Sequence, residues 1–300
     1  MVKPLVSVIM STYNETIDDL KKSTKSILNQ TYRNIEFIIV DDNPNNIELK
    51  DYLERIKDKR VRLIFNEKNI GLVKSLNKAI LNSSGDYIAR MDADDISINW
   101  RLEKQMDYLL NNGIDIVGAD IERIDEYDNI IQKHMHFPST DKEIKKHIKW
   151  GSCIPHPTWI VRKDIYIKLN GYRNIHSCED YDFLLRVINS GEYKLGNVPE
   201  VCLKYRVRQN SISLTNTDKQ YLLRLFLVGY FEKSTIASES DIMNYLNSHK
   251  YEADIYKYGK YKRNKQEIKK GNICSAVMLM FDKYLYMDLM EKIHLYLRER

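Results

Sequence analysis

The sequence predicts an α/β fold, with a largely parallel, Rossmann-like sheet flanked by helices and followed by an all-helical C-terminal region. Short apolar runs alternate with segments of about 10–15 residues that have helical periodicity, which is typical of βαβ units. From about residue 217 onward helix follows helix, with no clear strand pattern. We therefore expect an α/β domain over residues 1–215 and a helical region over residues 216–300.

The first part of the chain is expected to contain four buried strands, at residues 5–10, 35–40, 61–65 and 85–91. Polar residues mark the starts of the helices between them. Asp18 and Asp19 open the first helix, a second covers residues 47–57, and Asn69-Ile70-Gly71 caps a third that reaches Leu81. Apolar residues at helical spacing give each of these helices a face that can pack on the sheet.

The second part of the chain continues the pattern with less regular spacing. We expect a helix from residue 99, a strand at 114–119, a hairpin turn at 125–129, a strand at 130–137 and a short helix at 142–149. After a loop at 151–157 come a strand at 158–161, a helix ending at 170–171, a helix after residue 182 and a strand at 198–205.

Composition and charge limit the possible functions. Charged residues make up 30% and hydrophobic residues 43%, an ordinary globular balance, and a net charge of +5 does not call for a nucleic-acid partner. We find no signal-peptide pattern and no apolar run that could span a bilayer, so we expect a cytoplasmic protein. The cysteines lack metal-ligand spacing and are expected to be reduced: Cys153, Cys178, Cys202 and Cys274.

Polar clusters follow three of the predicted strands, at residues 12–15, 41–42 and 92–95. In parallel sheets ligands bind outside the carboxyl ends of the strands, so these clusters predict one site. Asp92, Asp94 and Asp95 would repel one another unless a cation or strong donors offset the repulsion, and carboxylates of this kind suit Mg²⁺ or Mn²⁺. The alternative is a solvated acidic turn that caps the helix beginning near Asn99.

A longer set of motifs carries a resemblance to a known family: residues 6–15, 38–42, 69–71, 76–80, 86–95, 171–173, 178–180 and 205–208. In this order and spacing, over about residues 5–213, they resemble the inverting glycosyltransferases of family 2, which have the GT-A fold. The resemblance implies a nucleotide-diphosphate sugar donor, expected to be a UDP-sugar, and a hydroxyl acceptor on a glycan or a lipid. It also implies a nucleotide-binding half at about 1–95 and an acceptor-binding half at about 96–215.

The resemblance assigns roles to the acidic motifs. Asp94 would contact a divalent cation, Mn²⁺ or Mg²⁺, with Asp95 as a second candidate ligand, while Asp92 and the neighbouring Ala93 would contact the ribose or the sugar. The cation would stabilise charge that builds on the departing diphosphate. Asp180 would be the general base that deprotonates the acceptor, with Glu179 as the fallback. The alternative for this pair is a helix N-terminus, where acids are favoured, and both interpretations can hold.

The nucleotide is expected across the first strands, where Thr12 and Tyr13 could contact uracil or ribose, Glu15 the ribose, and Asp42 the base. Asn69 would line the same pocket, and Arg90 would contact a phosphate or pair with Asp86. His156 and Trp159 are interpreted as a wall for the acceptor or donor sugar, with core packing an equal alternative for Trp159. A metal role for His134 and His136 is judged improbable.

One position departs from the family pattern. Members often end this region with Tyr-Arg-x-His, whereas Arg208 occupies the last position here. Arginine cannot ligate a cation, but it can grip diphosphate oxygens, so we expect Arg206 or Arg208 on the diphosphate.

The C-terminal region holds seven basic residues and one acid between Lys257 and Lys270. This stretch predicts peripheral contact with an anionic membrane face, where a lipid-linked acceptor would be presented. The alternatives are a helical cap on the catalytic domain or a homodimer contact.

By family analogy the enzyme is expected to build a bacterial surface or capsular polysaccharide. Two other functions are weighed against this: a nucleotidyltransferase, and a catalytically inactive protein that binds a nucleotide sugar or a glycan. The first predicts a glycine-rich loop after the first strand, and residues 11–15 contain no glycine. The intact acidic motifs argue against the second.

Overall fold

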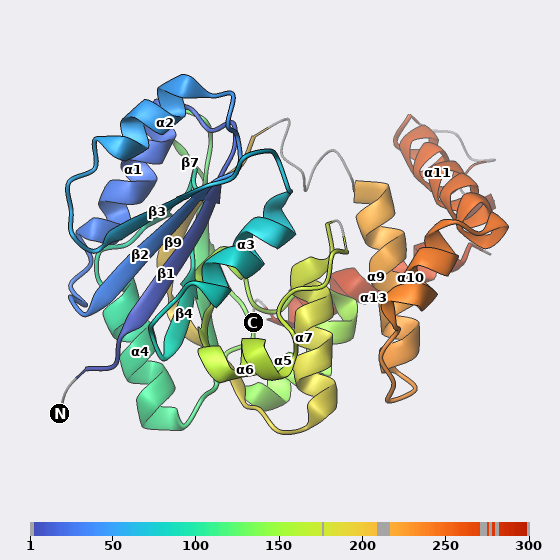
Figure 1. Ribbon diagram of the computed structural model, residues 1–300. Coiled ribbons are helices and arrows are strands. Elements are labelled where there is room, and N and C mark those ends of the chain that lie inside the picture. The colour runs from blue at the N-terminus through green and yellow to red at the C-terminus, as the bar shows by residue number, and fades with distance from the viewer. Residues whose placement is uncertain are drawn as a thin grey trace.

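The computed structural model describes residues 3–175, 177–208, 217–270, 275, 278–279 and 282–298. Within these residues one nine-stranded sheet has the order β3-β2-β1-β4-β8-β6-β9-β5, and β7 pairs with β6 (Figure 1). The first four strands pair with one another in parallel: β1 (Val6–Thr12), β2 (Ile35–Asp41), β3 (Val61–Phe65) and β4 (Tyr87–Arg90). These strands agree with the sequence prediction to within two residues.

The remaining strands extend the sheet on the β4 side, in parallel and antiparallel orientations: β5 (Ile96–Ser97), β6 (Ile116–Ile124), β7 (Ile130–Met135), β8 (Ile160–Arg162) and β9 (Leu195–Arg206). β8 runs antiparallel to β4 and β6, whereas β6 and β9 are parallel. The sequence did not predict β5, because two residues are too few to show a periodicity. This short strand pairs with Leu203 and Lys204 of β9 and so fixes the exit of the acidic loop 91–95.

Seven helices of the α/β part are described: α1 (Ile17–Leu28), α2 (Ile47–Glu54), α3 (Leu72–Leu81), α4 (Arg101–Asn112), α5 (Asp141–His147), α6 (Lys163–Lys168) and α7 (Glu179–Ser190). Side chains cap several N-termini, as Thr16 does for α1 and Asn46 for α2. Two short 3₁₀ helices flank the region expected as a loop at 151–157: η1 (Ile148–Trp150) follows α5, and η2 (His156–Thr158) begins within the expected loop.

The alternation of side chains along the central strands creates two cores. Val8 and Met10 of β1 point to the face covered by α1, α2 and α4, whereas Ile9 between them points to the face covered by α3, α6 and α7. β2 repeats the pattern with Ile38 and Ile39 on opposite faces. Because both faces are buried, the strands read as continuous apolar runs rather than as alternating ones.

The helical region comprises α9 (Thr217–Phe231), α10 (Glu239–Leu246), α11 (His249–Lys269) and α13 (Lys283–Arg298) among the described residues. Leu223 and Leu227 of α9 belong to the same core as Phe183 and Leu184 of α7. The first part of this region is therefore packed on the α/β part, while α11 extends outward (Figure 1). The expected boundary near residue 215 lies outside the described residues.

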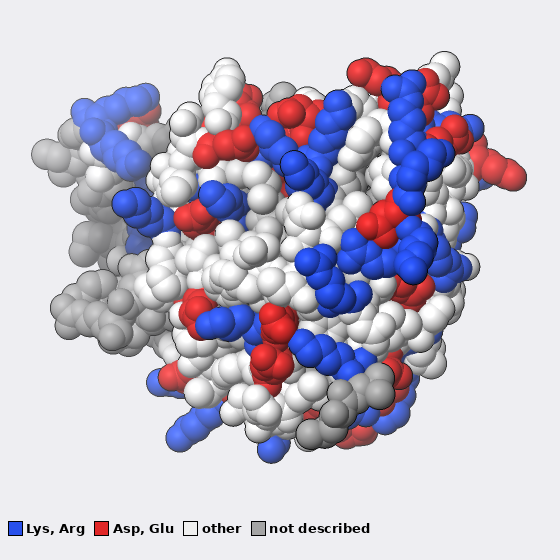
Figure 2. Space-filling view, turned by 90° about the vertical axis from the view of Figure 1, so that its left-hand side faces the viewer, with Lys and Arg blue, Asp and Glu red and all other residues white. Residues whose placement is uncertain are grey.

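The surface carries charges of both signs. On the face that Figure 2 presents, basic and acidic side chains are interspersed with uncharged surface. Within the described part of the chain, none of the helices combines the length and apolar character needed to cross a bilayer. Cys153, Cys178 and Cys202 are buried free thiols, and Cys274 lies outside the described residues.

The pairing of β6 with β9 places Gly118 beside Asn197 at a tightly packed point. A β-carbon on Gly118 would overlap the side chains of Asn197 and Ile154. The Asn197 amide is fully buried and donates to the carbonyls of Pro138 (2.7 Å) and Cys153 (2.8 Å), so it has little freedom to move.

Gly118→Ala should therefore lower the free energy of unfolding by about 1–3 kcal/mol, because the added methyl group overpacks the core. Gly229→Ala is the matched control, since a β-carbon on Gly229 of helix α9 meets no atom within 4 Å. The control should be neutral or stabilising by about 0.5–1 kcal/mol. Urea unfolding followed by circular dichroism measures both, and equal stabilities would contradict the packing described.

Candidate functional site

The acidic loop between β4 and β5 concentrates negative charge at the carboxyl end of β4. Burial, together with the nearby carboxylates of Asp92 and Glu15, raises the pKa of Asp94 to about 6 against the opposing charge of Arg208. Asp95 is buried, and burial together with Asp94 and Asp92 raises its pKa well above the ordinary value. The Asp95 Oδ1 atom accepts a hydrogen bond from the Arg206 backbone (2.8 Å), whereas Oδ2 has no hydrogen-bond partner among the described residues.

These observations fit a divalent cation held by Asp94 and Asp95. A raised carboxylate pKa means that nearby positive charge does not fully compensate burial and the neighbouring carboxylates. A buried oxygen without a hydrogen-bond partner can still accept a bond from a ligand. Oxygen ligands of this type suit Mg²⁺ or Mn²⁺. The alternative, in which the acidic residues cap the next helix, does not hold. The N-cap of α4 is Trp100, and it makes no side-chain hydrogen bond.

Arg208 lies directly beside the acidic loop. Its Nε donates to Asp94 Oδ2 (3.2 Å), and its guanidinium also pairs with Asp19 of α1. The side chain is 29% exposed, so it can reach a ligand at the rim. The position at which the family pattern described above often has a histidine thus holds a cation that already offsets part of the charge on Asp94.

Arg206 is not available to a diphosphate, which corrects the prediction. Its side chain is fully buried, and it donates to the carbonyl oxygens of Asp94 and Asp125, both at 2.8 Å. It also forms ion pairs with Asp19 (3.2 Å) and Asp128 (2.6 Å). Its function in the fold is to join the acidic loop, α1 and the β6–β7 turn.

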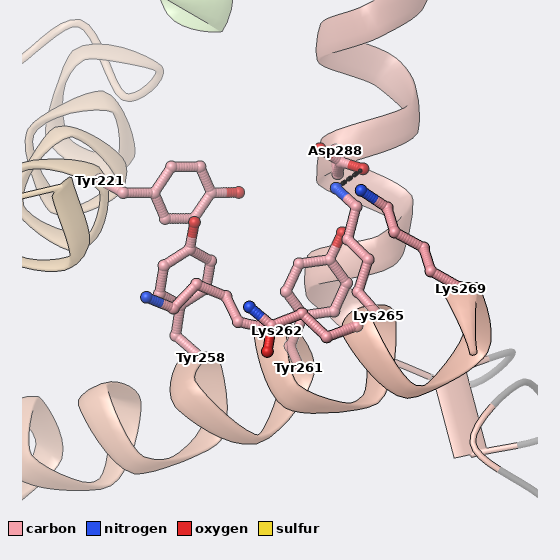
Figure 3. Close-up of a pocket in the computed structure, with 8 residues that line it drawn as sticks. Tyr221, Tyr258, Tyr261, Lys262, Lys265, Lys269 and Asp288 are labelled. Carbon is pink, nitrogen blue, oxygen red and sulfur yellow. Dashed lines mark hydrogen bonds and ion pairs between the residues drawn. The ribbon is translucent and has the colours of Figure 1, made fainter. Parts of the chain in front are cut away.

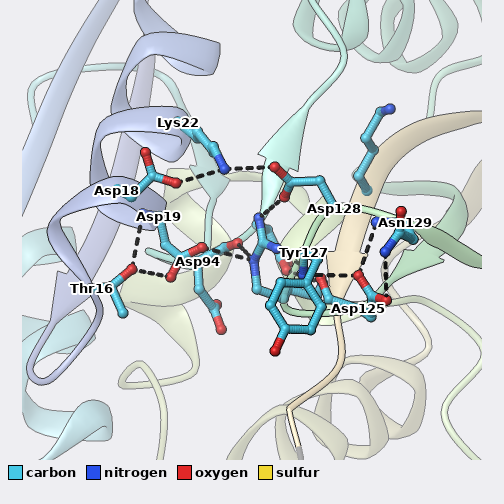
Figure 4. Close-up of polar contacts among 12 residues, drawn as sticks. Thr16, Asp18, Asp19, Lys22, Asp94, Asp125, Tyr127, Asp128 and Asn129 are labelled. Atoms are coloured by element: carbon cyan, nitrogen blue, oxygen red, sulfur yellow. Dashed lines mark hydrogen bonds and ion pairs between the residues drawn. The ribbon is translucent and has the colours of Figure 1, made fainter.

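Figure 4 shows this junction of three elements. Lys22 of α1 lies between Asp18 (2.7 Å) and Asp128 (2.6 Å), which ties the helix to the hairpin turn. Asp125 and Asn129 close the turn itself, since the Asn129 backbone donates to Asp125 Oδ1 (2.9 Å). From the sequence, Asp19 was expected only to start a helix, and the ion pair of Lys22 with Asp128 was not predicted. Opposite charges far apart in the chain carry no local signal.

Arg90 also differs from its predicted role. It is 1% exposed, pairs with Asp92 and donates to the Met91 carbonyl, so it neither pairs with Asp86 nor faces a phosphate. Its charge lowers the pKa values of Asp95, Glu179 and Asp180 against the larger effect of burial. Arg90 is therefore a buried counter-charge beneath the acidic groups.

The polar exit of β1 is organised by Glu15. Its Oε2 atom accepts hydrogen bonds from the Thr12 hydroxyl (2.6 Å) and the Tyr13 backbone (2.8 Å). Thr12 is buried at 1% exposure, so its hydroxyl is turned to Glu15 rather than to a ligand. The Tyr13 ring is 42% exposed and free to stack on a base, and that role stays a prediction.

Asp42 fixes the loop that precedes α3. Its carboxylate accepts from the backbones of Ile70 (2.9 Å) and Gly71 (2.8 Å) and from the Asn66 amide (2.9 Å). Gly71 has φ +86°, a conformation that favours glycine. Asn69 is exposed at the tip of this loop. The predicted contacts of Asp42 and Asn69 with the nucleotide are not tested by this geometry.

Glu179 and Asp180 are the first two residues of α7. Burial, together with the charge of Asp180, raises the pKa of Glu179 to about 7, and burial also raises the pKa of Asp180. The charges of Asp92 and Arg90 act on both carboxyl groups, so the pair and the acidic loop share one electrostatic environment. Ser177, two residues before Glu179, has φ +68°, an uncommon conformation for a residue with a side chain and one often found at functional sites.

A buried ion-pair network positions α7 and was not predicted. Asp182, 1% exposed, pairs with Arg173 and with Arg186, whose Nε lies 2.9 Å from Asp182 Oδ2. Arg186 in turn donates to the carbonyl oxygens of Leu169 (2.6 Å) and Gly171 (2.8 Å). Arg173 belongs to one of the motifs that carry the family resemblance, so its pairing with Asp182 gives that motif a structural reason.

The aromatic residues below the site form a core rather than a wall. Trp159 is fully buried, and its indole N–H donates to the Ile154 carbonyl (3.0 Å), so it cannot line a sugar site and the core alternative holds. His156 is half-buried between Trp159 and Tyr172, and its Nε2 lies 2.8 Å from the Tyr172 hydroxyl. Burial lowers the pKa of His156 well below its usual value, which keeps the ring neutral. Ala93 is buried in the opposite core and offers no side chain to a ligand.

A separate hollow of about 250 Å³ lies in the helical region and is shown in Figure 3. It is lined by Tyr221, Tyr258, Tyr261, Lys262, Lys265, Gln266, Lys269 and Asp288. Two of its lysines are already paired, Lys265 with Asp288 (2.9 Å) and Lys262 with Asp218 (2.5 Å). It contains none of the residues that the sequence assigned to the donor or the acceptor.

Comparison with known proteins agrees with the geometry. The glycosyl transferase family 2 model matches residues 7–170. An uncharacterized glycosyltransferase of Methanocaldococcus jannaschii is 42% identical over 225 residues, covering 74% of this chain and 77% of the relative. The O-antigen biosynthesis glycosyltransferase WbnJ of Escherichia coli is 37% identical over 69% of this chain and 81% of its own length.

A further relative and a solved structure extend the comparison. The E. coli UDP-Glc:alpha-D-GlcNAc-diphosphoundecaprenol beta-1,3-glucosyltransferase WfgD is 30% identical over 81% of this chain and 92% of its own. The crystal structure of S. aureus TarS 1–349 in complex with UDP-GlcNAc matches with a TM-score of 0.61 at 17% identity, over 79% of this chain and 69% of that one. The structural match confirms the expected GT-A fold. Together with the sequence matches, it identifies the chain as a glycosyltransferase that belongs to family 2.

Proposed function

We propose that the enzyme transfers a sugar from a UDP-sugar to a hydroxyl of a glycan or lipid-linked acceptor, with inversion and with the help of a divalent cation. The observation that carries the proposal is the shared electrostatic environment of Asp94, Asp92 and the Glu179–Asp180 pair. A sugar nucleotide and an acceptor must meet between a charge-stabilising group and a base, and these residues supply both kinds of group.

Asp94 and Asp95 would hold the cation, Mn²⁺ or Mg²⁺, with Asp92 directed to the ribose or the sugar. The bound cation would supply Lewis-acid stabilisation of the departing diphosphate. Arg208 would add a charge-assisted hydrogen bond to the same group, because its guanidinium is partly exposed beside Asp94. Tyr13, Glu15, Asp42 and Asn69 would form the nucleotide side of the site.

Asp180 would accept the proton of the acceptor hydroxyl as the oxygen attacks the anomeric carbon from the face opposite the diphosphate. Its place at the start of a helix fixes the carboxylate in space, and Asp182 with its arginine partners fixes the helix. Burial raises the pKa of Asp180 from its ordinary value, which makes it a stronger base than a solvated aspartate. Glu179 would affect the proton affinity of Asp180 through its neighbouring charge.

The acceptor class is proposed from the named relatives. WbnJ is named for O-antigen biosynthesis, and the name of WfgD gives UDP-Glc as donor and a diphosphoundecaprenol-linked sugar as acceptor. A similar role here would be the assembly of a bacterial surface or capsular polysaccharide at the cytoplasmic face of the membrane. The basic helix α11 could then approach anionic lipid, a contact that stays a prediction alongside the alternative of a homodimer.

Asp180→Asn should lower kcat at least about 100-fold with little change in donor affinity, because it removes the proton acceptor and keeps the shape. Glu179→Gln is the matched control and should keep most of the activity. Donor hydrolysis and transfer, followed by release of UDP, measure both variants. Equal activity of Asp180→Asn and wild type would exclude Asp180 as the base.

The same pair predicts the pH dependence of turnover. As the pH falls through about 7, the pKa of Glu179, Glu179 takes up a proton first, and kcat should keep most of its value because the Asp180 carboxylate remains the base. The acidic limb of the kcat profile should follow protonation of Asp180 itself, and Glu179→Gln, which mimics the protonated Glu179, should keep that limb. A limb near pH 7 that is absent from Glu179→Gln would contradict the assignment of Asp180 as the base.

Mn²⁺ with UDP should raise the Tm by several degrees, because binding at about 100 times Kd stabilises the fold by about 2.7 kcal/mol. Asp94→Asn should abolish this shift and the Mn²⁺-dependent activity. Glu48→Gln, an exposed acid on α2, is the control and should leave both unchanged. A full shift in Asp94→Asn, or activity that survives EDTA, would refute the proposed cation site.

Arg208→Ala should weaken UDP-sugar binding about 10-fold or more, since a hydrogen bond to a charged group contributes about 1.5–3 kcal/mol. Arg208→Lys keeps the charge but not the two-pronged geometry, so it should fall between Ala and wild type. Titration calorimetry in the presence of Mn²⁺ gives the dissociation constants. Unchanged donor affinity in Arg208→Ala would count against a diphosphate contact.

A further inference from the structure

We propose that Asp120, His134 and His136 form a binding site for a divalent transition-metal ion such as Zn²⁺, separate from the acidic loop. Asp120 lies on β6, and the two histidines lie on the β7 side of the hairpin. One ligand atom from each of the three side chains lies within 4.8 Å of the others. From the sequence, in which the two histidines alternate along a predicted strand, we judged a metal role for them improbable.

The backbone explains how the three side chains meet. His134 and His136 are two residues apart on an extended segment, so their side chains point to the same face. The pairing of Ile121 with Met135 places Asp120 opposite His136 across the antiparallel ladder. The two imidazole rings lie 3.7 Å apart between centroids, tilted by 35°, and one nitrogen of each faces Asp120 Oδ2.

The distances between the histidine nitrogens and the Asp120 carboxylate would allow a metal ion to take the place of the hydrogen bonds that join them. His134 Nε2 lies 2.7 Å and His136 Nδ1 lies 3.2 Å from Asp120 Oδ2. Ligand bonds of about 2.0–2.2 Å in a tetrahedral zinc site place the ligand atoms roughly 3.4 Å apart, so only a small opening is required. Each ring would carry its proton on the other nitrogen, which leaves a lone pair for the ion.

The surroundings have the features of a built site. Asp120 is fully buried, and its second oxygen, Oδ1, accepts from the Phe137 backbone at 2.9 Å, which orients Oδ2 toward the rings. His134 and His136 are 39% and 49% exposed, so an ion can enter and can keep water in its remaining positions. Two imidazoles and one carboxylate favour zinc-class ions over Mg²⁺, which prefers oxygen ligands alone.

An ion at this position would tie β7 to β6 at one end of the hairpin. The turn at the other end holds Arg206 through Asp125 and Asp128, and Arg206 in turn holds the acidic loop. The ion would therefore stiffen the element that supports the donor site without touching the substrate.

The full chain, stripped with EDTA and dialysed at pH 7.5, should bind one Zn²⁺ per molecule at micromolar concentration in titration calorimetry. His134→Gln and His136→Gln should each weaken binding at least about 10-fold. His249→Gln, which alters an exposed histidine paired only with Glu252 (3.0 Å), is the matched control and should bind as wild type does. Asp94→Asn should also bind Zn²⁺ normally, because it alters the other site.

Electron paramagnetic resonance of the wild-type chain with one equivalent of Cu²⁺ needs no variant and should show nitrogen coupling from two imidazoles. The proposal is overturned if Zn²⁺ binding does not saturate below about 1 mM, since such weak binding is that of isolated surface histidines. It is also overturned if the two histidine variants bind Zn²⁺ as wild type does, or if Asp94→Asn removes the binding. Each of these results would leave the cluster as a hydrogen-bonded anchor of the hairpin.

Discussion

The compensation of buried negative charge is the constraint on which the catalytic part of this structure depends. Asp92, Asp94 and Asp95 lie together after β4, with Glu179 and Asp180 close enough to sense Asp92. Arg90 from below and Arg208 from the rim offset part of this charge, and buried Arg206 fixes the loop backbone. The pKa values of Asp94, Asp95 and Glu179 remain raised, so the compensation is incomplete. That shortfall is what a cation and a proton would fill during the reaction.

The fold delivers these charges through ordinary rules. Continuous apolar strands with alternating sides build two cores, and the parallel arrangement brings the ends of β1, β2 and β4 to one edge. The buried network of Asp182 sets the start of α7, where Glu179 and Asp180 lie. The hairpin of β6 and β7 then supports the acidic loop through Arg206, so an element far from the substrate contributes to the geometry of the site.

Most of the sheet and the position of the acidic site could be predicted from the sequence, because apolar runs and polar strand ends are local signals. The roles of side chains whose contacts lie far away in the sequence could not be predicted in this way. Arg206 was one of two candidates for a diphosphate contact until its contacts with Asp19 and Asp128 became visible. Arg90 was expected to contact a phosphate or to pair with Asp86, whereas it pairs with Asp92. Trp159 was assigned equally to a sugar wall or to the core, and its burial places it in the core. The Asp120 cluster escaped notice because strand register alone brings its histidines to the carboxylate.

In the proposed site, Asp94 and Asp95 would hold a cation next to the donor diphosphate. Anomalous scattering from crystals soaked with Mn²⁺ and a UDP-sugar shows whether they do. We expect a manganese peak within ligand distance of Asp94 and next to the diphosphate, with Arg208 moved from Asp94 onto a phosphate oxygen. A diphosphate bound without any such peak, or Arg208 still paired with Asp94, would contradict it.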